Sequence, residues 1–245
     1  MLKSTMNVTR ERSMQGKSPT SKKQRIGNVH ILESRAISCL LTVIRDKSTP
    51  REKYVRHSDR LFHILCEEAL ALLPSVAPET VQTPCGPHDG LGYNFNAVDN
   101  LCAVSILRSG NIALEAVRAI VPDTAVGYIL IQRDEESEDK HAVYFYSKFP
   151  GDIAKRFVLL VDPMLATGGS ALAAMKCLVE KGVKEENVIF VNLVCVQEGI
   201  DALLKAHPGI TIVTCAKDPT LNEHKYIVPG VGDFGDRYYG TTSSL

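Results

Sequence analysis

An acidic residue and a loop of small residues follow a strand-like segment near the middle of the sequence. The apolar run Phe157–Val161 leads to Asp162, and the loop Ala166-Thr167-Gly168-Gly169-Ser170 then opens a helical stretch. Ligands of parallel α/β sheets bind outside the carboxyl ends of the strands. Free N–H groups at a helix N-terminus favour an anion, and adjacent glycines let a phosphate approach closely. The segment therefore predicts a phosphate site, with Asp162 placed for sugar hydroxyls or a metal on the phosphates.

Glycine patterns of this kind also occur in nucleotide-binding motifs and in plain turns. The loop is not of the Walker A type, because no Gly-Lys-Ser/Thr closes it, but a plain turn with Ser170 as N-cap stays open. A second pattern, Gly230-x-Gly232-x-x-Gly235, matches the dinucleotide fingerprint, which must open a helix in a unit of about 30 residues. Only ten residues follow Gly235. We therefore expect this second pattern to shape a compact loop whose backbone faces a planar base.

The segment from Asp162 to Ser170 resembles the phosphoribosyl-diphosphate (PRPP) loop of the type I phosphoribosyltransferases. Pro163 after the aspartate is similar to the uracil phosphoribosyltransferases among them. Three further segments resemble that family's basic loop, its second arginine site and its uracil-binding signature: Ser105-Ile-Leu-Arg108-Ser-Gly110, Ile131-Gln-Arg133-Asp134 and Tyr226-Ile-Val-Pro-Gly-Val-Gly232-Asp233-Phe234-Gly235-Asp236-Arg237-Tyr-Tyr-Gly-Thr241. Together with the family-like Thr42–Lys47, the resemblance spans residues 28–241.

The resemblance implies a reaction and a fold. The 5-phosphoribosyl group of PRPP would pass to uracil, giving UMP and pyrophosphate in pyrimidine salvage, with Mg²⁺ carried on the pyrophosphate of PRPP. No protein nucleophile is needed, because the protein mainly positions the substrates and stabilises the leaving group. The implied fold is α/β of the type I phosphoribosyltransferase kind: a mostly parallel sheet flanked by helices, with N-terminal helices and a C-terminal base-binding hood.

The resemblance also assigns residues, position by position. The implied catalytic residues are Asp233, Arg108 and Arg133. The implied PRPP-binding residues are Arg108, Arg133, Asp162, Pro163, Met164, Leu165, Ala166, Thr167, Gly168, Gly169, Ser170 and Asp233. The implied uracil-binding residues are Ile227, Gly232, Asp233 and Phe234. No metal ligands of the protein's own are expected. One departure lies beside the phosphates, where Ser109 stands in place of the family's usual alanine.

The elements that would position these residues follow from apolar periodicity. Two helical patterns come first, from residue 33 to Pro50 and over 51–73. Continuous apolar runs then alternate with helical stretches, which predicts a mostly parallel sheet covered on both faces. The expected strands are Cys102–Leu107, Val126–Ile131, Phe157–Val161, Val188–Val196 and Ile210–Cys215, with helices over Leu172–Val179 and Ile200–His207. The acidic run 134–139 predicts a solvated loop, followed by a returning strand at Ala142–Tyr146.

Charge and composition narrow the class of protein. Lysine plus arginine and aspartate plus glutamate number 28 each, so the basic surplus typical of nucleic-acid binding is missing overall. It is confined to residues 1–25, where seven basic residues face one glutamate. We expect residues 1–27 to be a disordered basic extension and 28–245 to be one phosphoribosyltransferase domain. A non-catalytic regulator of the same fold, which binds nucleotides or nucleic acid, stays open as the alternative.

The remaining expectations concern location and partners. Seven scattered cysteines without a C-x-x-C pair indicate reduced thiols in a cytoplasmic protein. The ending Ser243-Ser244-Leu245 only faintly resembles a peroxisomal address, because the central basic residue is missing. No run approaches the roughly 18 apolar residues of a membrane span. We expect uracil and PRPP as partners, no membrane and no nucleic acid. The resemblance implies a dimer or tetramer, and some members of the family respond to GTP.

Overall fold

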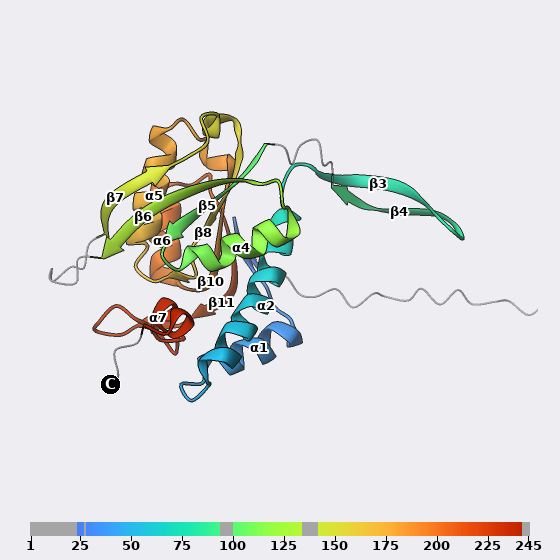
Figure 1. Ribbon diagram of the computed structural model, residues 1–245. Helices are drawn as coiled ribbons and strands as arrows, with labels where there is room; N and C mark the ends of the chain where they lie inside the picture. Colours follow the sequence, from blue (N-terminus) through green and yellow to red (C-terminus); the bar gives the residue numbers. More distant parts are fainter. Residues whose placement is uncertain (1–23, 27, 94–99, 134–141, 242–245) are drawn as a thin grey trace, which may run out of the picture.

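The computed structural model describes residues 24–26, 28–93, 100–133 and 142–241, and a nine-stranded sheet lies at its centre (Figure 1). Its strands are β1 (Gln24–Ile26), β2 (Val29–Ile31), β5 (Leu101–Leu107), β6 (Ala125–Arg133), β7 (Ala142–Lys148), β8 (Phe157–Val161), β9 (Met164–Leu165), β10 (Val188–Val196) and β11 (Thr211–Asp218). The order is β1-β2-β11-β10-β8-β5-β6-β7, and β9 also pairs with β10. The inner strands run parallel, whereas β1 and β7 run antiparallel to their neighbours.

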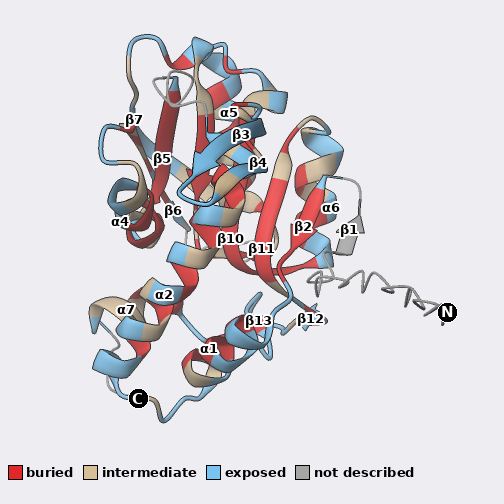
Figure 2. Ribbon diagram, turned by 90° about the vertical axis from the view of Figure 1, so that its right-hand side faces the viewer, coloured by how far each residue is buried: buried red, intermediate tan, exposed pale blue. Residues whose placement is uncertain are grey.

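The five strands expected from apolar runs are confirmed, with bounds that shift by no more than three residues. Their continuous apolar sequence fits burial on both faces. β10 is buried at every position, and Figure 2 shows the buried residues gathered on the inner strands. One hydrophobic cluster lies on each face of the sheet, the first containing Leu159 and Val191, the second Leu160 and Phe190. The returning strand expected at Ala142–Tyr146 is confirmed as β7.

Helices cover both faces of the sheet. On one face lie α1 (Arg35–Arg45), α2 (Arg51–Leu70) and α4 (Gly110–Ile120), and on the other α5 (Gly169–Glu180) and α6 (Gln197–Ala206). Ser34 caps α1 by accepting a bond from the Ile37 N–H at 3.1 Å. α2 ends three residues before the expected Leu73. No described helix combines the length and the apolar character that crossing a membrane requires.

Several elements were not predicted. α4 is one of them, although its pattern is amphipathic: Glu115 and Arg118 are exposed on one side, and Ile112, Ala113, Leu114, Ala116 and Val117 are buried on the other. β3 (Val76–Thr83) and β4 (Gly86–Tyr93) form a separate antiparallel hairpin that projects from the body. None of its strand residues is buried, and most are exposed. A hairpin without a buried face carries little periodic signal, and its prolines and glycines argue against strands.

Three expectations concern segments that are wholly or largely outside the described residues. Of the expected extension at 1–27, only Gln24–Ile26 is described, and it forms β1, with Arg25 opposite His30 of β2. The acidic run 134–139 and the ending 243–245 lie outside the described residues.

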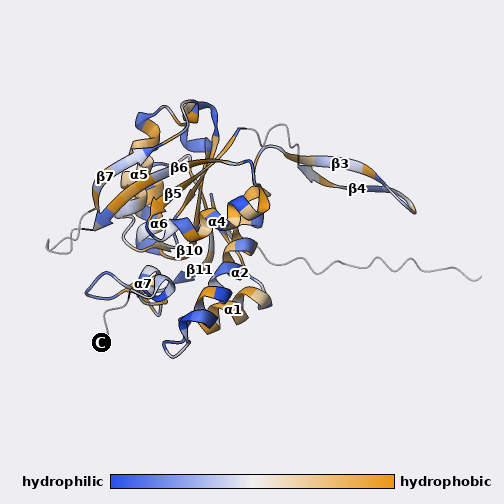
Figure 3. Cartoon of the chain, in the orientation of Figure 1, coloured by the Kyte–Doolittle hydropathy of each residue, from blue (hydrophilic) through white to orange (hydrophobic). Residues whose placement is uncertain are grey.

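The chain after β11 is fastened to the body by side chains rather than by the sheet. It holds the two-residue strands β12 (Thr220–Leu221) and β13 (Ile227–Val228) and the short α7 (Phe234–Tyr239), whose polar character contrasts with the apolar sheet in Figure 3. Asp218 is 6% exposed, and its carboxylate accepts hydrogen bonds from both terminal nitrogens of Arg45, at 2.7 and 2.8 Å. Gly230 closes the arrangement: its N–H donates to Asp218, and its carbonyl accepts from Arg45, both at 2.8 Å.

Replacing Asp218 by alanine should destabilise the protein markedly. The change leaves Arg45, whose side chain is 23% exposed, without its partner, and breaking a buried ion pair costs about 3–5 kcal/mol. Partial exposure of Arg45 lowers our expectation to about 2–3 kcal/mol. The measurement is the free energy of unfolding in urea.

The matched control is Glu52→Ala, which breaks the exposed pair with Arg56 on α2 and should cost less than about 0.5 kcal/mol. Equal losses for the two variants would contradict a stabilising role for the Arg45–Asp218 pair.

Candidate active site

A cavity of about 280 Å³ lies at the carboxyl ends of β5, β6 and β8, closed by the chain around α7. All four segments singled out in the sequence contribute to its wall. The lining residues are Ile106, Leu107, Arg108, Ser109, Ile131, Gln132, Asp162, Pro163, Met164, Ala166, Ser170, Lys225, Tyr226, Ile227, Gly232, Asp233, Phe234 and Gly235. Parallel sheets place their ligands at this edge. The cavity is therefore the candidate active site.

The loop after β8 is positioned by backbone bonds to β10. The Asp162 N–H donates to the Val191 carbonyl at 3.2 Å, and the Pro163 carbonyl accepts from Leu193 at 2.8 Å and from Val194 at 3.1 Å. β9 then pairs with the end of β10. This pairing turns Leu165 inward, where it is 1% exposed in the core. A ligand in the cavity can therefore contact only the backbone of Leu165.

The glycines of the loop have separate roles. Gly168 is the N-cap of α5 and has φ of 88°, a left-handed conformation that favours glycine. Ser170 lies inside the helix, so the alternative that makes it the N-cap is wrong. Ala166 and Ser170 line the cavity, whereas Thr167, Gly168 and Gly169 do not. The N-terminus of α5 therefore begins at the cavity wall and can meet an anion with backbone N–H groups.

Arg108 follows β5 and reaches across to the segment around α7. Its guanidinium donates to Asp236 at 2.7 Å and to Thr241 at 3.2 Å, and it lies 5.3 Å from the centre of the Tyr239 ring. A hydrogen bond from Thr241 lowers the pKa of Asp236 most, and one from Arg108 lowers it further, so it lies below its usual range. Beside it, Ser109 lies so close to Gly235 that any side chain at Gly235 would collide with the hydroxyl.

The base loop predicted from the C-terminal signature is compact, as expected. Gly230 and Gly232 have φ of 57° and 75°, which lets the chain turn between β13 and α7. Asp233 is the N-cap of α7, and its carboxylate accepts from the Asp236 N–H at 2.8 Å. Phe234 is buried, with its ring 5.5 Å from that of Tyr54. These contacts leave Asp233 exposed on the cavity wall.

The structure places some residues differently from the prediction. Arg133 ends β6, paired with Ala142 of β7, but its side chain lies outside what the structure describes. Gln132, Lys225 and Tyr226 line the cavity although the sequence did not single them out as ligands. Gln132 and Tyr226 lie inside two of the family-like segments, and this was the only sequence signal for them. Lys225 has φ of 65°, which sequence spacing does not reveal.

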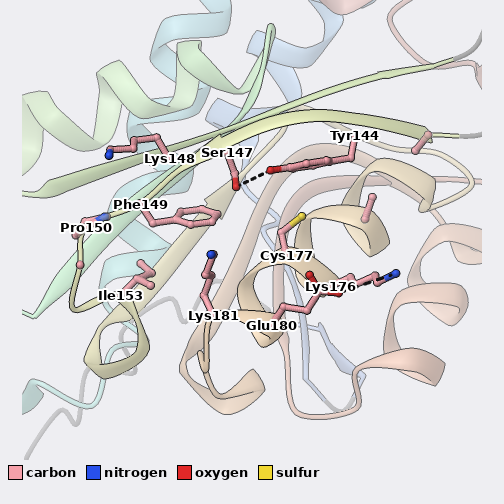
Figure 4. A pocket seen from close by; sticks show the side chains of 13 residues that line it. Tyr144, Ser147, Lys148, Phe149, Pro150, Ile153, Lys176, Cys177, Glu180 and Lys181 are labelled. Atoms are coloured by element: carbon pink, nitrogen blue, oxygen red, sulfur yellow. Dashed lines mark hydrogen bonds and ion pairs between the residues drawn. The ribbon is translucent and has the colours of Figure 1, made fainter.

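A larger cavity of about 830 Å³ lies elsewhere, between β7, the turn after it and α5 (Figure 4). Its wall contains none of the predicted ligands. Tyr144 and Ser147 bond to each other there at 2.9 Å, and Lys181 and Glu180 mark the carboxyl end of α5. That end of a helix repels an anion. Its size alone does not make this cavity the substrate site.

Among the described residues, no cysteine lines the candidate active site, and no three or more metal-binding side chains form a cage. Burial raises the pKa of Cys102 to about 12 and that of Cys195 to about 11, so both thiols stay protonated at neutral pH. No group of three or more histidine, cysteine, aspartate or glutamate side chains in the described ranges is placed to hold a metal ion. The cavity can therefore bind and orient anions, but the described residues offer it neither a thiolate nor a metal cage.

Comparison with known proteins identifies a family for most of the chain. The family model described as uracil phosphoribosyltransferase matches residues 31–241. The uracil phosphoribosyltransferase of Lachancea kluyveri is 45% identical over 214 residues, which cover 86% of this chain and 96% of that protein. The enzyme of the same name from Saccharomyces cerevisiae is 44% identical with the same coverage.

Solved structures agree on the fold. The AQ2163 protein from Aquifex aeolicus is 28% identical, covers 88% of this chain and 100% of its own, and has a TM-score of 0.74. The adenine phosphoribosyltransferase of Trypanosoma brucei is 11% identical, with a TM-score of 0.51 over 78% of this chain and 84% of its own. The second likeness concerns the fold alone.

Replacing Gly168 by alanine should destabilise the free protein by about 1–2 kcal/mol, because its left-handed backbone disfavours any other residue by that amount. The added methyl would meet Ala202 and the carbonyl of Gly199 at 3.4 Å, which is ordinary contact, so the backbone conformation accounts for the cost. The measurement is urea unfolding without ligand. Gly169→Ala is the control, since its methyl would meet nothing closer than 3.8 Å and alanine favours a helix. Equal stability of the two variants would contradict the assigned loop geometry.

Proposed function

The chain belongs to the uracil phosphoribosyltransferase family, and from this premise we propose how its own residues carry out the reaction. The protein is an enzyme that transfers the 5-phosphoribosyl group of PRPP to uracil, giving UMP and pyrophosphate. One observation supports the assignment of residues most strongly: side chains from all four family-like segments line a single cavity at the carboxyl edge of the sheet. The same cavity would therefore hold both substrates.

PRPP would lie along the loop between β8 and α5. Residues 166–170 would hold the 5′-phosphate, because backbone N–H groups at the start of α5 favour an anion there. Asp162, at the end of β8, would accept bonds from the ribose hydroxyls. Arg108 and Arg133 would face the pyrophosphate, since guanidinium forks match phosphate oxygens in geometry and charge.

Mg²⁺ would enter with PRPP. Magnesium is usually held by one or two carboxylates together with substrate phosphates rather than by a cage of protein ligands. The donor set fits this mode: Asp162 and Asp233 line the cavity, and the described residues contain no cluster of three metal-binding side chains. When bound, the ion neutralises charge on the leaving pyrophosphate.

The bond changes need positioning more than a nucleophile. The C1′–oxygen bond of PRPP breaks and its electron pair leaves with pyrophosphate, while uracil N1 forms the new bond and passes its proton to water. The ribosyl centre becomes cationic as the first bond breaks. Asp233, exposed on the wall beside the base loop, would stabilise that charge, and the two arginines would stabilise the pyrophosphate.

Uracil would be recognised by the base loop. Backbone groups around Gly232 and Phe234 would pair with O4 and N3–H of the base, and Ile227 would pack beside it. Gly232 supports this role, because it lines the cavity and has a positive φ, and without a side chain its backbone stays accessible to a planar base.

The same proposal covers assembly, location and regulation. The hairpin β3–β4 has almost no buried residues of its own, and an isolated hairpin is marginally stable in water, so it supports a homo-oligomer in which a second copy covers it. Free cysteines throughout the described residues favour a reducing cytoplasm. A response to GTP stays a prediction from the resemblance. No described feature favours a non-catalytic regulator.

Purified protein mixed with Mg²⁺, PRPP and uracil should release UMP and pyrophosphate, measured by chromatography. Cytosine presents the reversed hydrogen-bonding pattern at its position 4 and at N3, and would leave loop groups unpaired. Sites built on such bonds reject the wrong partner by about 10⁴-fold or more in kcat/KM. Comparable values for the two bases would contradict the assigned base loop, and no UMP at all would contradict the function.

Replacing Asp233 by asparagine should lower kcat by about 10²–10³, the usual loss when a preorganised electrostatic group is removed. Asparagine caps helices as well as aspartate does, so α7 and the melting temperature should be preserved. The charge acts chiefly in the transition state, so kcat and kcat/KM should fall together, with the KM for uracil little changed.

Asp233→Ser is the matched second variant, because serine also caps the helix without carrying a charge. A near-normal kcat in either variant would reduce Asp233 to a capping residue.

A further inference from the structure

We propose that Asp236 is a positioning residue that orients the Arg108 guanidinium over the cavity for the pyrophosphate of PRPP and ties that arginine to the base loop. This inference rests on the proposed function of Arg108. Asp236 does not line the cavity itself. It therefore acts through the arginine rather than on a substrate.

The geometry around Arg108 forms a closed set of contacts. Nη2 of Arg108 lies 2.7 Å from Oδ1 of Asp236, and Nη1 lies 3.2 Å from the Thr241 hydroxyl. The Thr241 hydroxyl donates in turn to Oδ1 of Asp236 at 2.6 Å. The guanidinium lies 5.3 Å from the centre of the Tyr239 ring. One carboxylate oxygen thus fixes both the arginine and the hydroxyl that holds its other nitrogen.

The arrangement leaves Arg108 able to bind an anion. A guanidinium carries five N–H donors, and the described residues use two of them. The side chain is 54% exposed and lines the cavity. A phosphate group can therefore meet the three remaining donors while the bond to Asp236 persists. Holding the fork in place beforehand removes the cost of ordering a long flexible side chain when PRPP binds.

Asp236 also connects the two ends of the reaction. Its backbone N–H donates to the Asp233 carboxylate at 2.8 Å, and its own carboxylate holds Arg108. One residue of α7 thus contacts both the acid of the base loop and the arginine of the pyrophosphate site. The same two segments also meet at the neighbouring residues, where Ser109, which follows Arg108, lies close to Gly235, which precedes Asp236. A shift of α7 would therefore move the arginine.

The first experiment measures the dissociation constant of PRPP with Mg²⁺ by calorimetry on the full chain. Asp236→Asn keeps the shape but weakens the charge-assisted bond, and restoring freedom to one long side chain weakens binding by up to about tenfold. We expect PRPP to bind about tenfold more weakly. Asp59→Asn is the matched control: Asp59 accepts from the Tyr238 hydroxyl at 2.6 Å, so it anchors the same α7 without touching Arg108. Its affinity should stay within about twofold of the parent.

A double-mutant cycle separates positioning from mere support of the helix. In an Arg108→Lys background the planar guanidinium that Asp236 orients is absent. Adding Asp236→Asn should then change PRPP affinity by less than about twofold. Thr241→Val provides an independent second variant outside the helix, and it should also weaken PRPP binding only when Arg108 is present.

Three results would overturn the inference. Equal losses in the Asp236→Asn and Asp59→Asn variants would mean that only anchoring of α7 matters. Tighter PRPP binding in Asp236→Asn would mean that the carboxylate competes with the substrate for the arginine. Unchanged affinity in Arg108→Lys alone would remove Arg108 from the pyrophosphate site, and this inference with it. UMP formation by the parent protein tests the proposed function separately and would be untouched by any of the three.

Discussion

The common direction of the inner strands is the constraint on which the rest of the structure depends. Because β5, β6 and β8 run parallel beside one another, their carboxyl ends meet at one edge, and the loops that follow must face the same space. Arg108 and Asp162 are 54 positions apart in the sequence yet line one cavity for this reason. The apolar runs that bury these strands thus decide where the polar loops come together.

The C-terminal wall of the candidate site is positioned in a different way, because no long strand of the sheet carries it. Arg237 donates to the carbonyls of Ile44 and Val231 at 2.6 Å and to that of Asp46 at 2.7 Å, and its guanidinium lies over the Tyr54 ring at 4.2 Å. With the Arg45–Asp218 pair, these contacts dock the C-terminal segment on α1 and α2. Planar guanidinium groups suit this task, since each can join several carbonyls and a ring at once.

The same division explains what the sequence could predict. Runs such as Val188–Val196 are apolar at nearly every position, so the strands and their parallel sheet followed from pattern alone. The hairpin β3–β4 did not, because it has no buried face. α4 was not predicted either, although its exposed polar residues and its buried apolar residues lie on opposite sides. The site followed from four segments that resemble a family, and ten of the residues carried over line the cavity. Side-chain bonds over long sequence distances, such as Arg108 to Asp236, leave no periodic trace.

The docking of α7 has a consequence for how the chain matures on the ribosome. Domains form from the N-terminal side as synthesis proceeds, and Arg45, Tyr54 and Asp59 emerge long before their partners Asp218, Phe234 and Tyr238. A nascent chain that has reached β11 already holds every strand of the central sheet. It still lacks the wall formed by the base loop. Premature termination there would yield a polypeptide whose candidate site is open on that side.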